Sequence, residues 1–331
     1  MTCIHLGTAL KVLDGNLMWH AGLTAPDTRR GAVLMTVSKD ALAGEITELQ
    51  CFVPTSHGRV WAHVCGPVGS SALPLVIVHG GPGFPSDYLQ PLDVLADERH
   101  VLRYDQISTG RSEPASDDSA WTVEAHVEHL EQVRAHFGFS RFHLLGHSWG
   151  GFLALSYIQA HPSRVASVTL SSPLVDSDRW MRDATTLIAR LPGVHQKSLA
   201  AGPADPGYAA AEAEYYRRHF CSIEPWPQSL QQAADGQDAA SYHAMWGPNE
   251  FTNTGVLRGQ SRAEVAKNLT IPNFWITGTD DEARPKTIRE IASMNVNSEV
   301  LVLPGTHCVH LENPSSYESA LRGFLHVADR D

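Results

Sequence analysis

The chain has 331 residues, of which 43% are hydrophobic and 18% charged, and its formal net charge is -11. This length accommodates one large domain, or one domain that carries a smaller insertion. The negative charge and the lack of a basic patch argue against nucleic acid or an anionic membrane as a partner.

The five cysteines stand at positions 3, 51, 65, 221 and 308, without the spacing of a metal site. Their odd number and scatter favour reduced structural thiols, and neither a metal nor an organic cofactor is implied. The N-terminus lacks a basic segment followed by an apolar run, and no apolar stretch is long enough to span a bilayer. The sequence predicts a cytoplasmic protein and leaves its oligomeric state open.

The first half of the chain predicts a hairpin followed by buried strands. Residues 1–44 have no clean periodicity and are interpreted as an N-terminal extension of unknown role. From Leu49 to Val64 the hydrophobic residues alternate on both sides of the turn residues 55–58, which predicts a β-hairpin. Apolar runs at 73–78 and 101–104 predict the next strands.

Helices and strands then alternate. A helix is expected from a cap at Thr122 through Phe137, because its apolar residues share one face and Gly138 stops it. The next strand, helix and strand are expected at 142–145, 150–160 and 165–170. This alternation predicts a largely parallel sheet with helices on both faces.

The alternation lapses between 176 and 267, where the sequence is helical and contains no strong strand. The pattern resumes with strands at 273–277 and 300–303, a helix from about 285 and a closing helix at 314–324. We therefore predict a core formed by residues 45–175 and 268–331, with an inserted helical cap, or lid, at 176–267.

The segment Gly146-His-Ser-Trp-Gly150 matches the G-x-S-x-G pattern. Its small residues allow the sharp strand-to-helix turn that exposes a nucleophilic serine. A predicted strand precedes this segment and a predicted helix follows it, so a Ser148 nucleophile is favoured over a surface turn. The predicted fold is accordingly the α/β-hydrolase fold, with a mostly parallel central sheet and the helical lid inserted in it.

A serine nucleophile needs a base that a third group orients, and in this fold the chain order is serine, acid, histidine. Asp280 and Asp281 follow a late strand; we favour Asp281 as the acid and interpret Asp280 as a turn cap. His307 follows the last strand and is the favoured base, while its competitor His310 is expected to pack against or cap the closing helix. Whether the neighbouring Cys308 affects activity is left open.

The segment His79-Gly-Gly-Pro-Gly83 follows the first buried strand. Its glycines allow a backbone N–H to face the site of a developing oxyanion, and the second donor is expected to be the N–H of Trp149. Gly-Pro-Gly is also a common tight turn. Two glycine-rich turns after neighbouring strands favour the catalytic interpretation.

These pieces resemble the proline iminopeptidase family of α/β-hydrolases, with its tricorn-interacting aminopeptidase and amino-acid amidase relatives. The resemblance covers the chain from about residue 50 to the end. It is carried by His79-Gly-Gly-Pro-Gly83, Tyr104-Asp-Gln106, Gly110-Arg-Ser112, Gly146-His-Ser-Trp-Gly-Gly151, Gly247-Pro-Asn-Glu-Phe251, Gly278-Thr-Asp-Asp281 and Gly305-Thr-His307.

The resemblance implies an enzyme that releases an N-terminal residue from a small molecule or short peptide through an acyl-enzyme. The implied catalytic residues are Ser148, Asp281 and His307, with oxyanion donors at Gly81 and Trp149. The lid is expected to bind the free α-amine of the substrate through carboxylates, with Glu250 as the first candidate, and further substrate contacts are assigned to His79 and Gly80.

The chain departs from the family pattern at the lid. Relatives tend to carry a glutamate near Gly207 or Ala210, which this chain lacks, and three nearby glutamates are not placed by the motif, namely Glu212, Glu214 and Glu224. Ser108 also replaces a usual glycine. The alternative hypothesis is therefore an esterase, lactonase or tailoring amide hydrolase acting on substrates without a free amine. A ligand-binding protein on the same scaffold is disfavoured by the complete catalytic set.

Overall fold

The computed structural model describes residues 45–330, preceded by five short strands. These are β1 (Leu6–Gly7), β2 (Lys11–Leu13), β3 (Asn16–Met18), β4 (Gly22–Leu23) and β5 (Leu34–Thr36). The rest of residues 1–44 lies outside the described residues, and with it the interpretation of this range as an extension of unknown role.

The centre of the fold is one sheet in the order β13-β12-β11-β10-β8-β9-β7-β6-β5. Strands β8 to β13 run parallel to one another, whereas the pairs β5/β6, β6/β7 and β7/β9 are antiparallel. Their bounds are β6 (Ile46–Thr55), β7 (Gly58–Pro67), β8 (Leu75–Val78), β9 (Val101–Tyr104), β10 (Phe142–His147), β11 (Val165–Ser171), β12 (Asn273–Gly278) and β13 (Ser298–Leu303). The predicted mostly parallel sheet is confirmed.

Helices cover both faces of this sheet because its strands are apolar on both sides. In β8 the alternate residues Val76 and Val78 join one core cluster and Leu75 and Ile77 the other. The first cluster lies under α1 (Val123–His136) and α2 (Trp149–Ala160), and the second under α11 (Pro314–Ala328) and the 3-10 segment η1 (Ser86–Asp97). The sequence analysis did not predict η1.

The caps expected for α1 are present. The Thr122 hydroxyl accepts a hydrogen bond from the Ala125 N–H at 3.1 Å, which satisfies one of the free donors of the first turn. At the other end Gly138 takes a positive φ of 68°, the left-handed conformation that ends a helix. The predicted hairpin is also present, with Thr55 paired to Gly58 across its turn.

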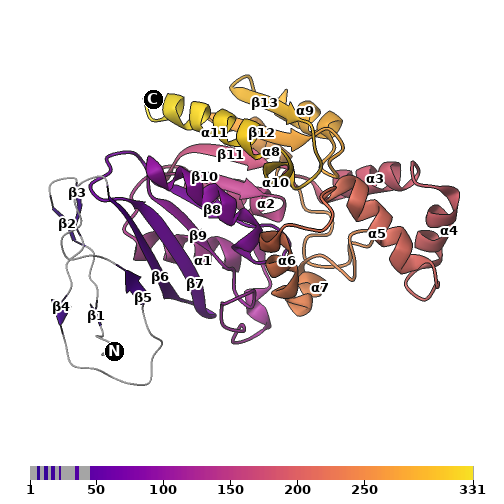
Figure 1. Ribbon diagram of the computed structural model, residues 1–331, viewed down its shortest axis with the longest axis horizontal. Coiled ribbons are helices and arrows are strands. Elements are labelled where there is room, and N and C mark those ends of the chain that lie inside the picture. The colour runs from indigo at the N-terminus through magenta and orange to yellow at the C-terminus, as the bar shows by residue number, and fades with distance from the viewer. Residues whose placement is uncertain are drawn as a thin grey trace.

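The segment 176–267 is helical, as its composition indicated, and no named strand falls within it. Its helices are α3 (Ser177–Ile188), α4 (Gly193–Ala201), α5 (Tyr208–His219), α6 (Gln228–Asp235), α7 (Ala239–Met245) and α8 (Ala263–Lys267). Figure 1 shows α3, α4 and α5 gathered beyond one end of the sheet. The chain returns to the core through β12, and α9 (Pro285–Ala292) and α10 (Val309–Glu312) follow β12 and β13. A short 3-10 turn, η2 (Asp118–Ala120), precedes α1.

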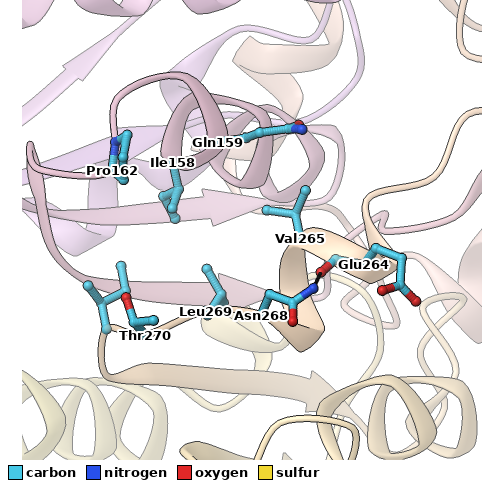
Figure 2. Close-up of a pocket in the computed structure, with 9 residues that line it drawn as sticks. Ile158, Gln159, Pro162, Glu264, Val265, Asn268, Leu269 and Thr270 are labelled. Carbon is cyan, nitrogen blue, oxygen red and sulfur yellow. Dashed lines mark hydrogen bonds between the residues drawn. The ribbon is translucent and has the colours of Figure 1, made fainter.

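A pocket of about 380 Å³ lies between the end of α2 and the α8 segment, away from the predicted site residues. It is lined by residues such as Ile158, Val265 and Leu269 (Figure 2).

No helix within residues 45–330 is long and apolar enough to cross a membrane.

Candidate active site

Ser148 lies at the sharp turn between β10 and α2, with φ 56° and ψ -123°. The turn requires the flanking glycines. A Cβ on Gly146 would lie 2.2 Å from the Gly150 oxygen, and one on Gly150 would lie 2.2 Å from the Val78 oxygen. The Ser148 N–H donates to the Ser171 oxygen at 3.1 Å, so a neighbouring strand helps to hold this conformation. A backbone under this strain is typical of functional residues.

Asp281 and His307 come from the loops after β12 and β13 and meet directly. The Nδ1 of His307 lies 2.8 Å from Oδ1 of Asp281, and both side chains are buried. The Asp281 carboxylate also accepts hydrogen bonds from the Ser172 and Thr277 hydroxyls at 2.6 and 2.8 Å. A carboxylate held this firmly can fix the orientation and tautomer of the imidazole.

The structure separates the favoured residues from their competitors. Asp280 is exposed, and its backbone oxygen accepts a hydrogen bond from His219. His310 is buried and its Nε2–H donates to the Tyr88 oxygen at 3.0 Å. Burial lowers the pKa of His310 to about 4. Neither competitor lines the cavity that contains Ser148 and His307.

The glycine-rich turn after β8 brings Gly80 and Gly81 to the cavity that contains Ser148. Gly81 lines the cavity, and its φ of 108° suits glycine. Trp149 is the first residue of α2, where a backbone N–H has no partner within the helix. Gly80 also lines the cavity, but its N–H donates to the Tyr88 hydroxyl at 2.8 Å and is therefore not free for a substrate.

His79 does not contact the cavity, which corrects its assignment as a substrate-binding residue. It is fully buried, and its Nε2 accepts a hydrogen bond from the Gln106 N–H at 2.8 Å. The Gln106 side chain in turn accepts a hydrogen bond from the Trp149 indole at 2.9 Å. His79 therefore supports the glycine-rich turn without contacting the cavity. Ser108, which replaces a usual glycine, takes the left-handed φ of 66° that glycine would supply.

Tyr88 and His147 connect the parts of this site. The Tyr88 hydroxyl accepts from Gly80, so its single proton is directed to Nδ1 of His147, 2.9 Å away. The Nε2–H of His147 then donates to the backbone oxygen of His307 at 3.0 Å. This buried chain ties the glycine turn to the loop that carries His307.

A cavity of about 520 Å³ opens onto these residues, and its wall combines the core with the segment 176–267. Ser148 and His307 lie on its core side. Three glutamates also line it, namely Glu212 on α5, Glu250 after α7 and Glu282 after β12. Among the residues 45–330 that line it there is no lysine or arginine, and Glu214 and Glu224 do not line it.

Glu282 is a residue that the sequence analysis missed. It follows Asp281 directly, is 4% exposed, and its Oε1 lies 3.7 Å from Nε2 of His307. Its Oε2 is buried and lies beside the buried hydroxyl of Tyr215, although the two atoms do not meet the geometry of a hydrogen bond. The run Asp280-Asp-Glu282 signals this residue, because it places a third carboxylate directly after the two aspartates that follow β12.

The carboxylates set the electrostatics of the cavity. Burial raises the pKa values of Glu250, Glu282 and Glu212. The Tyr242 hydroxyl opposes this at Glu250 by donating a hydrogen bond to Oε1 at 2.6 Å. Burial alone would lower the pKa of His307, but the neighbouring carboxylates outweigh it and raise that pKa. The cavity therefore favours a cation.

Cys308 follows His307 but does not line the cavity. Its thiol is fully buried, and burial raises its pKa well above the ordinary value. A buried protonated thiol reacts slowly with thiol reagents. Cys308 is therefore a buried residue next to His307 that has no contact with the cavity.

Comparison with known proteins gives one family. Residues 74–314 match the model of the alpha/beta hydrolase fold. The chain is 33% identical over 281 residues to a proline iminopeptidase of Heyndrickxia coagulans, which covers 83% of this chain and 97% of that protein. A crystal structure of a proline iminopeptidase from Mycobacterium smegmatis superposes with a TM-score of 0.79 at 34% identity, covering 85% and 98% of the two chains.

A second crystal structure, that of VinJ, also superposes with a TM-score of 0.79, at 29% identity and over 84% of this chain and 98% of that one. These relatives span almost their whole lengths on this chain, so the similarity includes the segment 176–267 as well as the core. The chain therefore belongs to the proline iminopeptidase family and is a serine hydrolase of the α/β-hydrolase fold.

Proposed function

We propose that this enzyme is an aminopeptidase or amino-acid amidase that removes an N-terminal residue carrying a free α-amine. The observation that carries the proposal is the cavity that Ser148 and His307 share with three glutamates, with no lysine or arginine among the described residues that line it. The named activity of the relatives from Heyndrickxia coagulans and Mycobacterium smegmatis agrees with it.

The proposed chemistry proceeds through an acyl-enzyme. The Ser148 oxygen attacks the substrate carbonyl while His307 takes its proton, and Asp281 stabilises the imidazolium. The N–H groups of Gly81 and Trp149 stabilise the oxyanion. His307 then protonates the leaving amine, and water attacks the ester with His307 again as the base. The Ser148 proton thus reaches the leaving amine in the first step, and the proton of the attacking water reaches the Ser148 oxygen in the second.

The glutamates give this scheme its substrate preference. The Glu250 and Glu282 carboxylates both line the cavity and would bind the substrate ammonium. An ammonium beside buried carboxylates relieves the cost of leaving them unpaired. Glu212 supplies a further carboxylate on α5, close in sequence to Gly207 and Ala210, where relatives tend to carry a glutamate.

The same ammonium would also prepare the base. In the empty cavity the carboxylates raise the pKa of His307, which favours the imidazolium that cannot accept a proton from Ser148. A bound ammonium offsets the charge of Glu250 and Glu282 and so lowers that pKa again. A free-amine substrate therefore binds and favours the reactive form of His307.

A panel of amino-acid amides and p-nitroanilides tests the proposal. Each compound is assayed with its α-amine free and with the amine acetylated, and release of free amino acid is measured. Higher kcat/KM for the free-amine member of each pair is expected. Turnover of the acetylated members alone would favour the esterase, lactonase or tailoring amide hydrolase.

Glu282→Gln is expected to shift the pH profile of the enzyme. The Glu282 carboxylate helps to raise the pKa of His307, so its removal lowers that pKa. Activity requires neutral His307, and the acid limb of kcat/KM for an N-acetyl ester should therefore move to lower pH. Glu264→Gln, an exposed change on α8 outside the cavity, is the control. An acid limb that stays in place would contradict the coupling.

Tyr88→Phe is expected to lower kcat by about 10- to 100-fold with little change in KM. It removes both the acceptor for the Gly80 N–H and the donor to His147, so the glycine turn and the His307 loop lose their connection. Tyr157→Phe removes a hydroxyl that bonds Glu131 on α1, and serves as the matched control. Equal losses of kcat in Tyr88→Phe and Tyr157→Phe would show that Tyr88 contributes only to the stability of the fold.

A further inference from the structure

A second cluster of reactive side chains lies outside the cavity. His63 and Cys65 are two residues apart on β7 and so project from the same face of that strand. Asp93 belongs to η1, the segment that packs against this face. One potential ligand atom from each of the three residues lies within 4.8 Å of the other two.

The orientation of His63 leaves one ring nitrogen free. Its Nε2–H donates to Oε1 of Glu48 on the neighbouring strand β6, at 2.8 Å. The Nδ1 atom lies 3.5 Å from Oδ2 of Asp93 and has no hydrogen-bond partner among the described residues. In the neutral ring this atom carries a lone pair. The His63 residue is only 3% exposed. A buried lone pair opposite a carboxylate is unfavourable unless a proton or a metal cation lies between them.

We propose that His63, Cys65 and Asp93 bind a divalent transition metal of the zinc type. Imidazole nitrogen, thiolate sulfur and carboxylate oxygen are the ligands that zinc uses in proteins, at about 2.0 to 2.3 Å. A tetrahedral ion at those distances separates its ligand atoms by about 3.3 to 3.8 Å. The 3.5 Å between His63 and Asp93 falls in that range. The Glu48 contact also orients His63 as carboxylates commonly orient metal-binding histidines.

Arg103 is the cation already present beside the cluster. Its Nε lies 3.1 and 3.0 Å from the two oxygens of Asp93. When Cys65 binds as a thiolate, it brings one negative charge to those of Glu48 and Asp93, and Arg103 with a divalent ion balances them. Arg103 therefore acts as a neighbour that holds the Asp93 carboxylate in place.

The position of the cluster gives the ion a structural role. The side chain of Asp93 is 16% exposed, which leaves a route from solvent. A bound ion would fasten the β6–β7 hairpin to η1, the segment that also carries Tyr88. Metal binding would thereby stabilise the support of the glycine turn without entering the catalytic cavity.

Cobalt and zinc titrations of the full chain test this site, after treatment with a chelator. About one Co²⁺ per chain is expected to bind, with absorption from thiolate-to-cobalt charge transfer. Cys65→Ser should remove that absorption and weaken binding by at least tenfold. Cys51→Ser changes another buried thiol outside the cluster and should leave both the absorption and the Co²⁺ affinity unchanged. Zn²⁺ should raise the Tm of the wild type but not of Cys65→Ser.

Three results would overturn the assignment. Absence of the charge-transfer absorption at excess Co²⁺ would leave the cluster as an ion-pair network around a protonated His63. Retention of the absorption in Cys65→Ser would place the ion on another thiol. An unchanged wild-type Tm with Zn²⁺ would remove the structural role. If Cys65→Ser does not fold, His63→Gln provides the same comparison, because its amide retains a donor for Glu48 but lacks the imidazole nitrogen.

Discussion

Ser148→Ala is expected to lower kcat by about five to six orders of magnitude on every substrate that the wild type hydrolyses. The change removes the oxygen that forms the acyl-enzyme and leaves the other groups of the cavity in place. The loss is measured as the release of amino acid from an amide over a long incubation. Labelling by a fluorophosphonate probe is measured in parallel. The wild type should label at Ser148, and the variant should not.

Ser148→Ala also has a clear structural control. Alanine meets the same backbone requirement as serine at φ 56°, so the variant should keep the circular dichroism spectrum and Tm of the wild type. Persistent labelling or turnover in a folded variant would show that another residue is the nucleophile. Loss of the fold would leave Ser148→Cys, with its altered nucleophile, as the informative comparison, and a label on that cysteine is then expected.

Glu250→Gln is expected to lower kcat/KM for free-amine substrates by about two to three orders of magnitude. Removing one partner of a buried charge pair costs about 2 to 5 kcal/mol, and the substrate ammonium would lose that partner. Glutamine keeps the shape of the side chain and can still accept a hydrogen bond from Tyr242. The measurement is kcat/KM for an amino-acid p-nitroanilide and for its N-acetyl counterpart.

The control is Glu214→Gln. Glu214 lies on α5, where it pairs with Arg217 and Arg218 outside the cavity. This variant should retain wild-type kcat/KM on both substrates. Equal losses on the free-amine and acetylated substrates in Glu250→Gln would contradict amine recognition and indicate a general effect on the site.

Much of the core was predictable because local signals agreed with the packing. The predicted strand at 101–104 and the helix between Thr122 and Gly138 have almost the predicted bounds, since caps and apolar spacing are local features. The order of Ser148, Asp281 and His307 could be read because each follows a predicted strand. Parallel strands place such loops at one edge of the sheet.

The remaining features depend on contacts between distant segments. His79 could not be separated from a substrate contact until Gln106 was placed against its ring. Glu282 looked like one more acidic residue in a turn. Glu212 lines the cavity because the end of α5 at His219 is bonded to the loops that carry Asp280 and His307. The cluster with Asp93 likewise has no local spacing signal, because η1 joins it from a separate segment.

The proposed reaction requires an aminoacyl ester to form at Ser148 from a substrate with a free amine. Acid quenching during turnover of an amino-acid ester, followed by mass spectrometry of the digested protein, measures that intermediate. We expect the aminoacyl mass on the peptide containing Ser148, and far less adduct from the N-acetylated ester at equal concentration. An adduct only from the acetylated ester would contradict the proposed specificity, and an adduct on another residue would contradict the proposed nucleophile.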